Sequence, residues 1–250
     1  MAQITRIALV TDFGSSGPYS GQMILRLGHL APDVSAVDLI SDLAPFRPDL
    51  AAYLLPALVR NVPGVTLFVC VVDPGVGSER DAIAVEADGR WYLGPDNGLL
   101  SAVVRRASDA RVLRIEWRPD RLSDSFHGRD LFCPLAAMLC RGELPDSVPI
   151  DSGAIVGADW PDDLARVVYA DRYGNLITGI RASAVSRRAA VRIGGLDVFY
   201  ARTFCEVPPG EVFWYENSFG LVELAVNRGR AELVLGLVPG DPIDLLPSQT

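Results

Sequence analysis

Lysine is absent from this chain, and all 23 of its basic residues are arginine. Without a lysine side chain, a protein cannot form a Schiff base with its substrate, anchor pyridoxal phosphate or supply the lysine of a P-loop. The composition alone therefore excludes these enzyme mechanisms.

Long apolar runs and basic charge are also scarce. No apolar run approaches the about 20 residues that a membrane span needs, and the N-terminus does not resemble a secretory signal. The formal net charge of −8 opposes binding to the phosphates of nucleic acids. We therefore expect a cytoplasmic protein that binds neither membrane nor nucleic acid.

Metal-binding patterns are missing as well. The chain has only two histidines, and its four cysteines include no pair with the CxxC spacing of a zinc site. We expect no metal site. Buried, reduced thiols are expected at the four cysteines, which are Cys70, Cys133, Cys140 and Cys205.

The chain does contain an alternation of strand-like and helix-like segments. Short apolar runs predict strands at residues 4–10, 35–40, 65–72, 83–87, 91–93 and 111–116. Apolar residues at helical spacing predict helices at residues 22–30, 50–62, 99–107 and 131–139. This alternation predicts an α/β fold with a mostly parallel central sheet, which we place in an N-terminal domain at residues 1–150.

The composition changes at residues 144–164, where several prolines and glycines predict a linker. Beyond it, short β-rich runs separated by turn signals predict strands at residues 166–170, 190–193, 198–201, 212–215, 221–226 and 231–235. This spacing is typical of a small β-barrel or sandwich. We therefore place a C-terminal β-barrel domain at residues 165–250.

Two aspartates follow strands that look buried on both faces. Asp12 comes after the first predicted strand, and Asp73 comes directly after the apolar run at residues 65–72. Ligands of open α/β sheets bind at the carboxyl ends of the strands, so both carboxylates are candidate site residues on one edge of one sheet. Either aspartate alone is better explained as the cap of a loop or helix, whereas the pair favours a site.

His127 and Arg80 are further candidates. Imidazole is the usual proton-handling group, although a lone histidine is more often structural. Arg80 follows Asp73 by seven residues across a glycine-containing turn, which lets its guanidinium fold back toward the carboxylate. Taken alone, such an ion pair has little consequence. The polar turns at residues 96–98 and 171–175 are equally well explained as turn formers.

Together these segments resemble one family. Six motifs occur in order, at residues 11–14 (TDFG), 72–77 (VDPGVG), 94–98 (GPDNG), 126–130 (FHGRD), 171–175 (DRYGN) and 217–220 (NSFG). They are similar to those of the S-adenosyl-L-methionine (SAM) hydrolases, also called SAM hydroxide adenosyltransferases, which are relatives of fluorinase and chlorinase. The resemblance implies hydrolysis of SAM to adenosine and L-methionine without a cofactor. It also implies a homotrimer whose active sites lie between the N-terminal domain of one subunit and the C-terminal domain of its neighbour.

The resemblance further implies roles for individual residues. A carboxylate suits the two ribose hydroxyls because it has two acceptor oxygens, and an amide suits the adenine edge because it can donate and accept at once. The resemblance therefore implies that Asp12 binds the ribose and Asn175 binds the adenine. It implies that Phe46 and Phe204 contact the faces of the nucleoside, and that Asp171 and Ser218 hold the methionine end.

Asp73, Arg80 and His127 match the trio that the hydrolases place around the nucleophilic water. The halogenases have a tyrosine in place of Asp73, and fluorinase has a serine in place of Gly128, so this chain has a charged shell that suits water or hydroxide. Arg80 would stabilise hydroxide character, while His127 and Asp73 would orient the oxygen and accept its proton. A sulfonium leaves as a neutral thioether, so neither an acid nor a metal is required.

Other functions remain open at this point. A non-catalytic SAM or adenosine-binding protein would need Asp12 and Asn175 but not the trio. A halogenase is disfavoured by Asp73, and a dinucleotide enzyme is disfavoured because no GxGxxG follows the first strand. The relatives commonly have aspartate in place of Gly17 and asparagine in place of Gly179, so the methionine end or the rim of the pocket is expected to differ.

Overall fold

The computed structural model describes residues 3–246, and the chain divides into two compact units. The first comprises the chain up to Ala52 together with Val62–Trp160, and the second comprises Tyr53–Asn61 together with the chain from Pro161 onward. Each unit has a hydrophobic core of its own. Within residues 3–246, no helix is long and apolar enough to cross a membrane.

The first unit is built on a seven-stranded sheet with the order β2-β1-β3-β5-β4-β6-β7. Strands β2, β1, β3 and β5 pair in parallel, whereas β4, β6 and β7 extend the sheet by antiparallel pairing. Every residue of β3 is buried, as its unbroken apolar sequence predicts. The strands are β1 (Arg6–Thr11), β2 (Ser35–Ile40), β3 (Thr66–Val71), β4 (Ala82–Ala87), β5 (Arg90–Pro95), β6 (Ala110–Ile115) and β7 (Ser147–Ile150).

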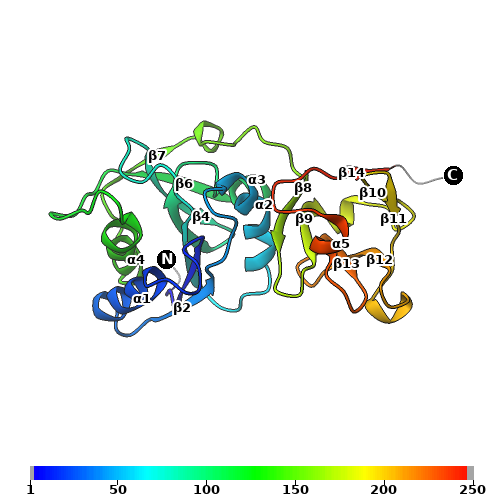
Figure 1. Cartoon of the computed structure of the whole chain (residues 1–250). Helices are drawn as coiled ribbons and strands as arrows, with labels where there is room; N and C mark the ends of the chain where they lie inside the picture. The colour runs from blue at the N-terminus through cyan, green and yellow to red at the C-terminus, as the bar shows by residue number, and fades with distance from the viewer. Residues whose placement is uncertain (1–2, 247–250) are drawn as a thin grey trace. The chain divides into compact units, whose positions relative to one another are not determined.

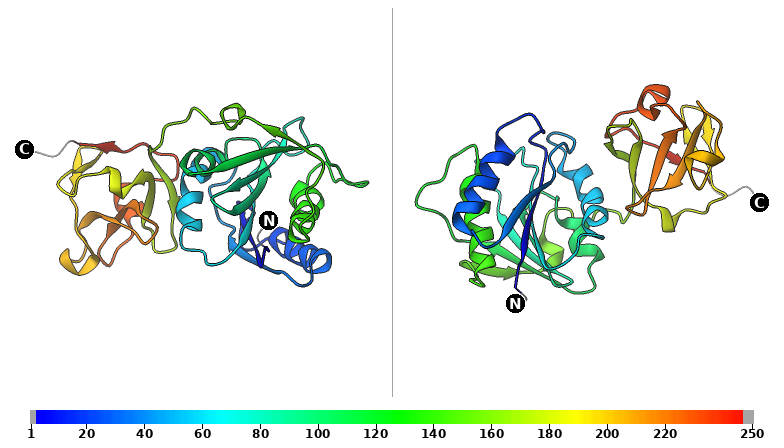
Figure 2. Two further views of the ribbon diagram at one scale, coloured as in Figure 1. Left: turned by 180° about the vertical axis from the view of Figure 1, so that it is seen from behind. Right: turned by 90° about the horizontal axis from the view of Figure 1, so that it is seen from below.

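Helices cover both faces of this sheet. Helices α1 and α4 lie together on one face, and α3 and the start of α2 lie on the other (Figures 1 and 2). Met23 and Leu27 of α1 and Leu135 of α4 belong to the same buried cluster as Leu67 and Val69 of β3. The predicted α/β architecture is therefore confirmed. The helices are α1 (Tyr19–Leu30), α2 (Pro48–Val59), α3 (Ser101–Arg106) and α4 (Cys133–Cys140), with short turns η1 (Gly128–Phe132) and η2 (Ser152–Ala154).

The second unit contains two antiparallel sheets, β12-β13-β9-β8 and β11-β10-β14. Side chains from both sheets share one core, which includes Val191 and Leu224, and isolated bridges at Arg166 and Tyr200 link the sheets. This is the separate β domain that the turn spacing predicts. Its elements are β8 (Leu164–Ala170), β9 (Leu176–Arg181), η3 (Ala182–Ala184), β10 (Val191–Ile193), β11 (Leu196–Val198), η4 (Phe204–Glu206), β12 (Val212–Glu216), β13 (Leu221–Val226), α5 (Ala231–Leu235) and β14 (Asp244–Leu245).

The structure corrects one predicted strand and adds another. Residues 231–235 form helix α5, which ends at Gly236 in the left-handed conformation, and Leu233 is 73% exposed. An apolar run that looked like a buried strand is thus a short, mostly exposed helix. Strand β9 was missed because Gly179 interrupts its apolar sequence, yet Gly179 pairs directly with Leu164 of β8.

The predicted linker and one predicted thiol also need correction. Strand β7 lies inside residues 144–164 and pairs with β6 at the edge of the sheet. An edge strand tolerates proline, so Pro149 gave a misleading linker signal.

The strand predicted at residues 198–201 lies earlier in the chain, as β11, which ends at Val198. All four cysteines are free; Cys70 and Cys133 are buried, whereas Cys205 is exposed in η4, contrary to expectation.

Candidate functional site

Asp12 and Asp73 lie at the same edge of the sheet. Strands β1 and β3 are parallel neighbours, with Thr11 opposite Val71, so the residues that follow them emerge side by side. Burial raises the pKa of Asp12, and the negative charge of Asp73 raises it further, while a hydrogen bond from the backbone N–H of Phe46 to Asp12 Oδ2 (2.9 Å) acts in the opposite direction. The predicted common edge is confirmed.

Arg80 folds back onto Asp73 as the spacing predicts. Its Nε donates to both carboxylate oxygens of Asp73 at 2.9 Å, and its Nη2 donates to Oδ2. The two side chains are only 11% and 4% exposed, respectively, so this ion pair is screened little by solvent. Arg80 and Asp73 therefore form a largely buried ion pair at the sheet edge, not a surface ion pair.

The turn between these two residues packs against the segment that leads to His127. Gly77 has a φ of 81°, and a Cβ atom there would lie 2.5 Å from the backbone oxygen of Asp124. Only glycine fits this close approach. Directly before Asp73, the carbonyl of Val72 accepts a hydrogen bond from Asn97 Nδ2 at 2.8 Å, which holds this end of the strand in place.

His127 completes the cluster. Arg80 Nη2 lies 3.0 Å from His127 Nδ1. Because a guanidinium can only donate, Nδ1 must accept, and the ring proton is assigned to Nε2. Burial lowers the pKa of His127 and the charge of Arg80 lowers it further, against a smaller opposing effect of Asp73. His127 is therefore a neutral imidazole whose Nε2 is a donor. The π-helical turn η1 follows it directly, a geometry frequent at functional sites.

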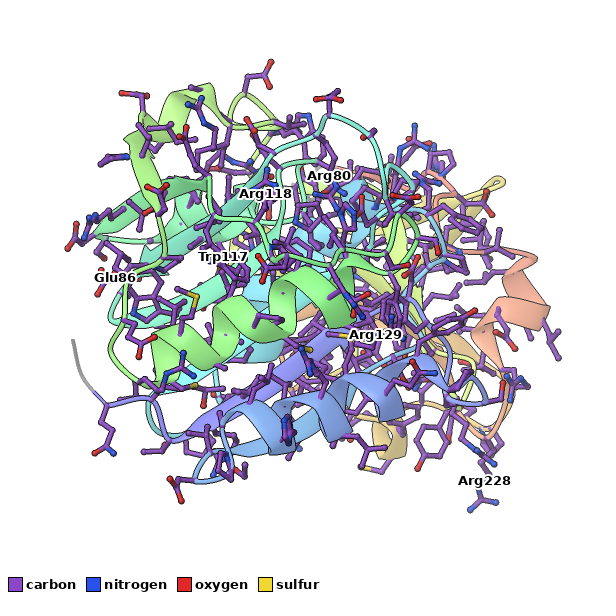
Figure 3. All side chains as sticks on the ribbon, turned by 90° about the vertical axis from the view of Figure 1, so that its left-hand side faces the viewer. Arg80, Glu86, Trp117, Arg118, Arg129 and Arg228 are labelled. Atoms are coloured by element: carbon purple, nitrogen blue, oxygen red, sulfur yellow. The ribbon has the colours of Figure 1, made fainter. Side chains whose placement is uncertain are left out.

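Sequence reasoning missed Arg118, which also lowers the pKa of His127. Figure 3 shows Arg118 and Arg80 on the same side of the first unit. The guanidinium of Arg118 is held by the carbonyls of Ile115 (2.8 Å) and Trp117 (2.9 Å). Arg118 follows strand β6 and belongs to none of the six motifs, so no sequence signal identified it.

An aromatic cluster beside His127 was missed as well. The rings of Phe13, Tyr19 and Phe126 contact one another, with centroid separations of 5.3 to 5.8 Å. A Cβ atom at Gly128 would lie 3.0 Å from Met23 Sδ and 3.3 Å from the Phe126 ring. The position where fluorinase has serine is therefore crowded in this chain.

In the second unit, Asp171 and Asn175 form one turn between β8 and β9. Asp171 Oδ1 accepts the backbone N–H of Asn175 at 2.9 Å, and Oδ2 accepts the Asn175 side-chain Nδ2–H at 3.0 Å. Asn175 is only 6% exposed. The carboxylate thus orients the amide, which is a structural task in addition to any contact that Asp171 makes with a ligand.

The other predicted contacts of this unit lie on two other segments. Ser218 is exposed in the turn between β12 and β13, where Asn217 Oδ1 accepts the N–H groups of Phe219 (2.9 Å) and Leu221 (3.0 Å). Phe204 begins η4, and its ring packs edge-on against Tyr215 with centroids 5.5 Å apart.

Glu223 is a buried carboxylate that sequence reasoning did not single out. It is 4% exposed in the middle of β13, and it accepts hydrogen bonds from the hydroxyl of Tyr215 (2.5 Å) and from Asn217 Nδ2 (2.8 Å). Burial raises the pKa of Glu223. A lone glutamate in an apolar strand was the only available signal.

The predicted residues thus divide into two groups, one in each unit. The positions that depart from the family pattern differ in kind: Gly17 lies in an exposed loop, whereas Gly179 is buried, and a Cβ atom there would lie 2.7 Å from the Cβ of Leu164. Within residues 3–246, no group of three or more acidic, histidine or cysteine side chains could hold a metal ion. The first group comprises Asp12, Phe46, Asp73, Arg80 and His127; the second comprises Asp171, Asn175, Phe204 and Ser218.

Comparisons with known proteins cover most of the chain. Residues 7–149 match the family model described as SAM hydroxide adenosyltransferase N-terminal domain, and residues 165–244 match the corresponding C-terminal domain. The (R)-S-adenosyl-L-methionine hydrolase of Thermus thermophilus is 37% identical, over 96% of this chain and 99% of that protein. A fluorinase of Nocardia brasiliensis is 23% identical, over 54% of each chain. The crystal structure of an uncharacterized conserved protein from Thermotoga maritima superimposes with a TM-score of 0.84 at 28% identity, over 96% of this chain and 100% of that one.

Proposed function

This chain belongs to the SAM hydroxide adenosyltransferase family, and we propose that it hydrolyses SAM to adenosine and L-methionine. One observation carries the proposal: Arg80 joins the carboxylate of Asp73 to the imidazole of His127 at the sheet edge that also holds Asp12. A protein that only bound SAM would have no need of this partly desolvated charged cluster. The protein is therefore an enzyme.

The reaction needs little from the protein beyond placement and proton acceptance. Water attacks C5′ of the ribose, the bond between C5′ and sulfur breaks, and its electron pair stays on sulfur as the neutral thioether of methionine. One proton of the attacking water must be removed. Holding the water in line behind C5′ and accepting its proton are the two contributions that the site supplies, the second worth about 10²- to 10⁴-fold in rate.

The geometry assigns orientation of the water to one residue and acceptance of its proton to another. His127 Nδ1 already accepts from Arg80, so its Nε2–H orients the water by donating to its oxygen. The remaining lone pairs of Asp73 accept the proton. This refines the expectation that both residues accept it, because a neutral imidazole with its proton on Nε2 has no acceptor nitrogen left. The charge of Arg80 stabilises developing hydroxide.

Substrate binding would use both groups of residues. Asp12, oriented by the backbone N–H of Phe46, accepts from the ribose hydroxyls, and the Phe46 ring, which is 71% exposed, covers the nucleoside. Asn175 binds the adenine edge, and Phe204 supplies a second aromatic face. Asp171 and Ser218 hold the methionine end. No cofactor takes part, since the leaving group needs neither protonation nor a metal.

Isotope labelling tests the proposed reaction directly. Turnover of SAM in oxygen-18 water should place the label at the 5′ oxygen of adenosine, as measured by mass spectrometry of the separated products. Asp73→Asn should suppress turnover, whereas Asp197→Asn, whose ion pair with Arg192 lies at the surface, should retain it. Unlabelled adenosine would rule out direct attack by water at C5′, and the absence of adenosine and methionine would rule out the function.

We also propose that the active unit is a homotrimer in which the first unit of one subunit meets the second unit of its neighbour. The separation of the ribose and adenine contacts into two units supports this arrangement. Co-expressing an Asp12→Ala chain with an Asn175→Ala chain should restore activity that neither variant has alone, because one kind of mixed interface contains no substitution. Purified mixed trimers without any recovered activity, or a monomer in sedimentation, would contradict the proposal.

A further inference from the structure

The motif at residues 94–98 (GPDNG) has no role in the proposed reaction, yet the strand order places it next to the site. Strand β5 lies between β3 and β4, and it ends at Pro95. The chain leaves β3, spans the end of β5 and enters β4, and the 73–80 loop that makes this crossing carries Asp73 and Arg80. The residues that follow β5 therefore emerge between the two ends of the 73–80 loop.

Both ends of the 73–80 loop are hydrogen-bonded to the motif. At the first end, Asn97 Nδ2 donates to the carbonyl of Val72 at 2.8 Å. At the other end, the backbone N–H of Asp96 donates to the carbonyl of Asp81 at 2.9 Å. Two adjacent residues of the motif thus hold the two points at which the loop leaves and rejoins the sheet.

The amide of Asn97 has one favourable orientation. Its Oδ1 accepts the backbone N–H of Leu99 at 3.3 Å, while its Nδ2 donates to Val72. A flipped amide would set oxygen against oxygen and N–H against N–H. Because Val72 is fully buried, loss of the Nδ2 donor favours a shift of the strand end toward another partner for its carbonyl.

The motif is itself held by the segment that follows β7. Asp96 Oδ1 accepts the backbone N–H of Val156 at 2.9 Å. Gly98 has a φ of 95°, and a Cβ atom there would lie 2.3 Å from the ring of Trp160. Only glycine allows this backbone conformation and this close approach together. The motif is therefore a fixed support for the 73–80 loop.

We propose that Asn97 is a positioning residue: through the carbonyl of Val72 it sets the place of Asp73, which accepts the proton of the attacking water. The inference rests on the proposed function, in which Asp73 has that role. Both polar atoms of the Asn97 side chain are used by the backbone, so Asn97 acts through the strand end and not on the substrate. A misplacement of about 1 Å in a reacting group is enough to cost about 10²-fold in rate.

The test measures the single-turnover rate of the SAM-saturated enzyme beside the calorimetric affinity for adenosine. Asn97→Ala removes both hydrogen bonds without adding charge. It should lower the rate about 10- to 100-fold, while the affinity and the number of binding sites stay nearly unchanged. Asn227→Ala is the matched control, because Asn227 Nδ2 also donates to a backbone carbonyl, that of Val207 in the second unit. It should leave the rate of the bound complex unchanged.

A double substitution shows whether Asn97 acts through Asp73. When Asp73→Asn is already present, adding Asn97→Ala should change the residual rate by less than about threefold, because the group that Asn97 positions has been lost. A merely structural role would lower the rate by the same factor in both backgrounds. That result would overturn the inference, as would a full rate in Asn97→Ala alone.

A second variant covers the case in which Asn97→Ala does not fold. Asn97→Asp keeps the acceptor for the N–H of Leu99 and removes only the donor to Val72, and the same loss of rate is expected. A wild-type enzyme that released no adenosine and methionine from SAM would remove the proposed function and the inference with it. Full rates in the Asn97 variants would overturn the inference alone and leave the function standing.

Discussion

The two units hold their polar side chains by different means. In the first, opposite charges meet: Arg80 lies between the carboxylate of Asp73 and the ring of His127. In the second, carboxylates hold neutral amides: Asp171 accepts from Asn175, and Glu223 accepts from Asn217. A charged cluster can respond to charge that develops during a reaction, whereas a locked amide presents one fixed pattern of donors and acceptors. We therefore expect the charged cluster to act on the rate and the held amides to act on substrate recognition.

The two clusters are also built on different scaffolds. The charged cluster stands on loops that follow parallel strands, and these loops pack tightly enough that Gly77 has no room for a side chain. The held amides Asn175 and Asn217 stand on turns between antiparallel strands, and Glu223 lies within the sheet on β13. Parallel strands gather several loop ends at one edge, whereas antiparallel neighbours bring side chains from adjoining strands face to face.

The largest effect is expected at His127. His127→Ala should lower kcat by about 10²-fold or more while the affinity for SAM stays nearly intact, because the ring acts on the attacking water. His29→Ala is the matched control, since this second histidine is exposed in the last turn of α1. Single-turnover rates and calorimetric affinities measure the two quantities. Lost binding with an unchanged rate for the bound complex would show that His127 holds the substrate instead.

The next largest effect is expected at Asp12, where a substitution should weaken binding, whereas His127→Ala should lower the rate. Asp12→Ala removes two hydrogen bonds to the ribose that exist in every bound state, so SAM and adenosine should both bind more weakly, by about 10- to 100-fold. Asp33→Ala, at an exposed position, is the control. Calorimetry with adenosine alone measures this loss of affinity without interference from turnover. A variant that bound adenosine normally but turned over slowly would show that Asp12 belongs to the charged cluster and not to the ribose site.

A moderate effect on stability is expected at Gly128. Gly128→Ser introduces a side chain against the buried Met23 and the partly buried Phe126, so the free energy of unfolding should fall by about 1–3 kcal/mol. Gly28→Ser, where a Cβ atom would meet nothing within 4 Å, should have little effect. Urea denaturation followed by circular dichroism measures both. Equal stability of the two variants would show that the space beside His127 adapts more readily than its packing indicates.

The smallest effect concerns pH. Protonation of His127 would place a second N–H, at Nδ1, against the guanidinium of Arg80. Burial and Arg80 lower the pKa of His127 from its ordinary value of 6.5, so the loss of kcat that follows from this protonation should lie below pH 6.5. Between the folded and unfolded pKa values the unfolded chain binds more protons, and the contribution of His127 to stability is lost as the pH falls through that window. Arg118→Gln should move the acid limb toward higher pH, while Arg121→Gln should not. An unmoved limb in Arg118→Gln would exclude Arg118 from the electrostatics of the site.

Local sequence was sufficient for much of the first unit. The apolar run before Asp73 predicted a strand buried on both faces, and a common sheet edge for Asp12 and Asp73 followed from the rule for parallel strands. The return of Arg80 to Asp73 needed only a short loop of seven residues. These features depend on neighbours in the chain or on a general property of sheets, which is why a single sequence reveals them.

Features that depend on pairing between distant segments appeared only in the folded chain. The proton of His127 is assigned to Nε2 because Arg80 reaches Nδ1, and Arg118 matters only because the end of β6 comes near that ring. Glu223 is a lone charge in an apolar strand, and only the register of β13 places it opposite its hydrogen-bond donor Tyr215 of β12. Periodicity and spacing decide which segments become strands and which residues share a short loop. Hydrogen-bond partners across a sheet follow from strand order and register, and these are settled by the packing of the whole unit.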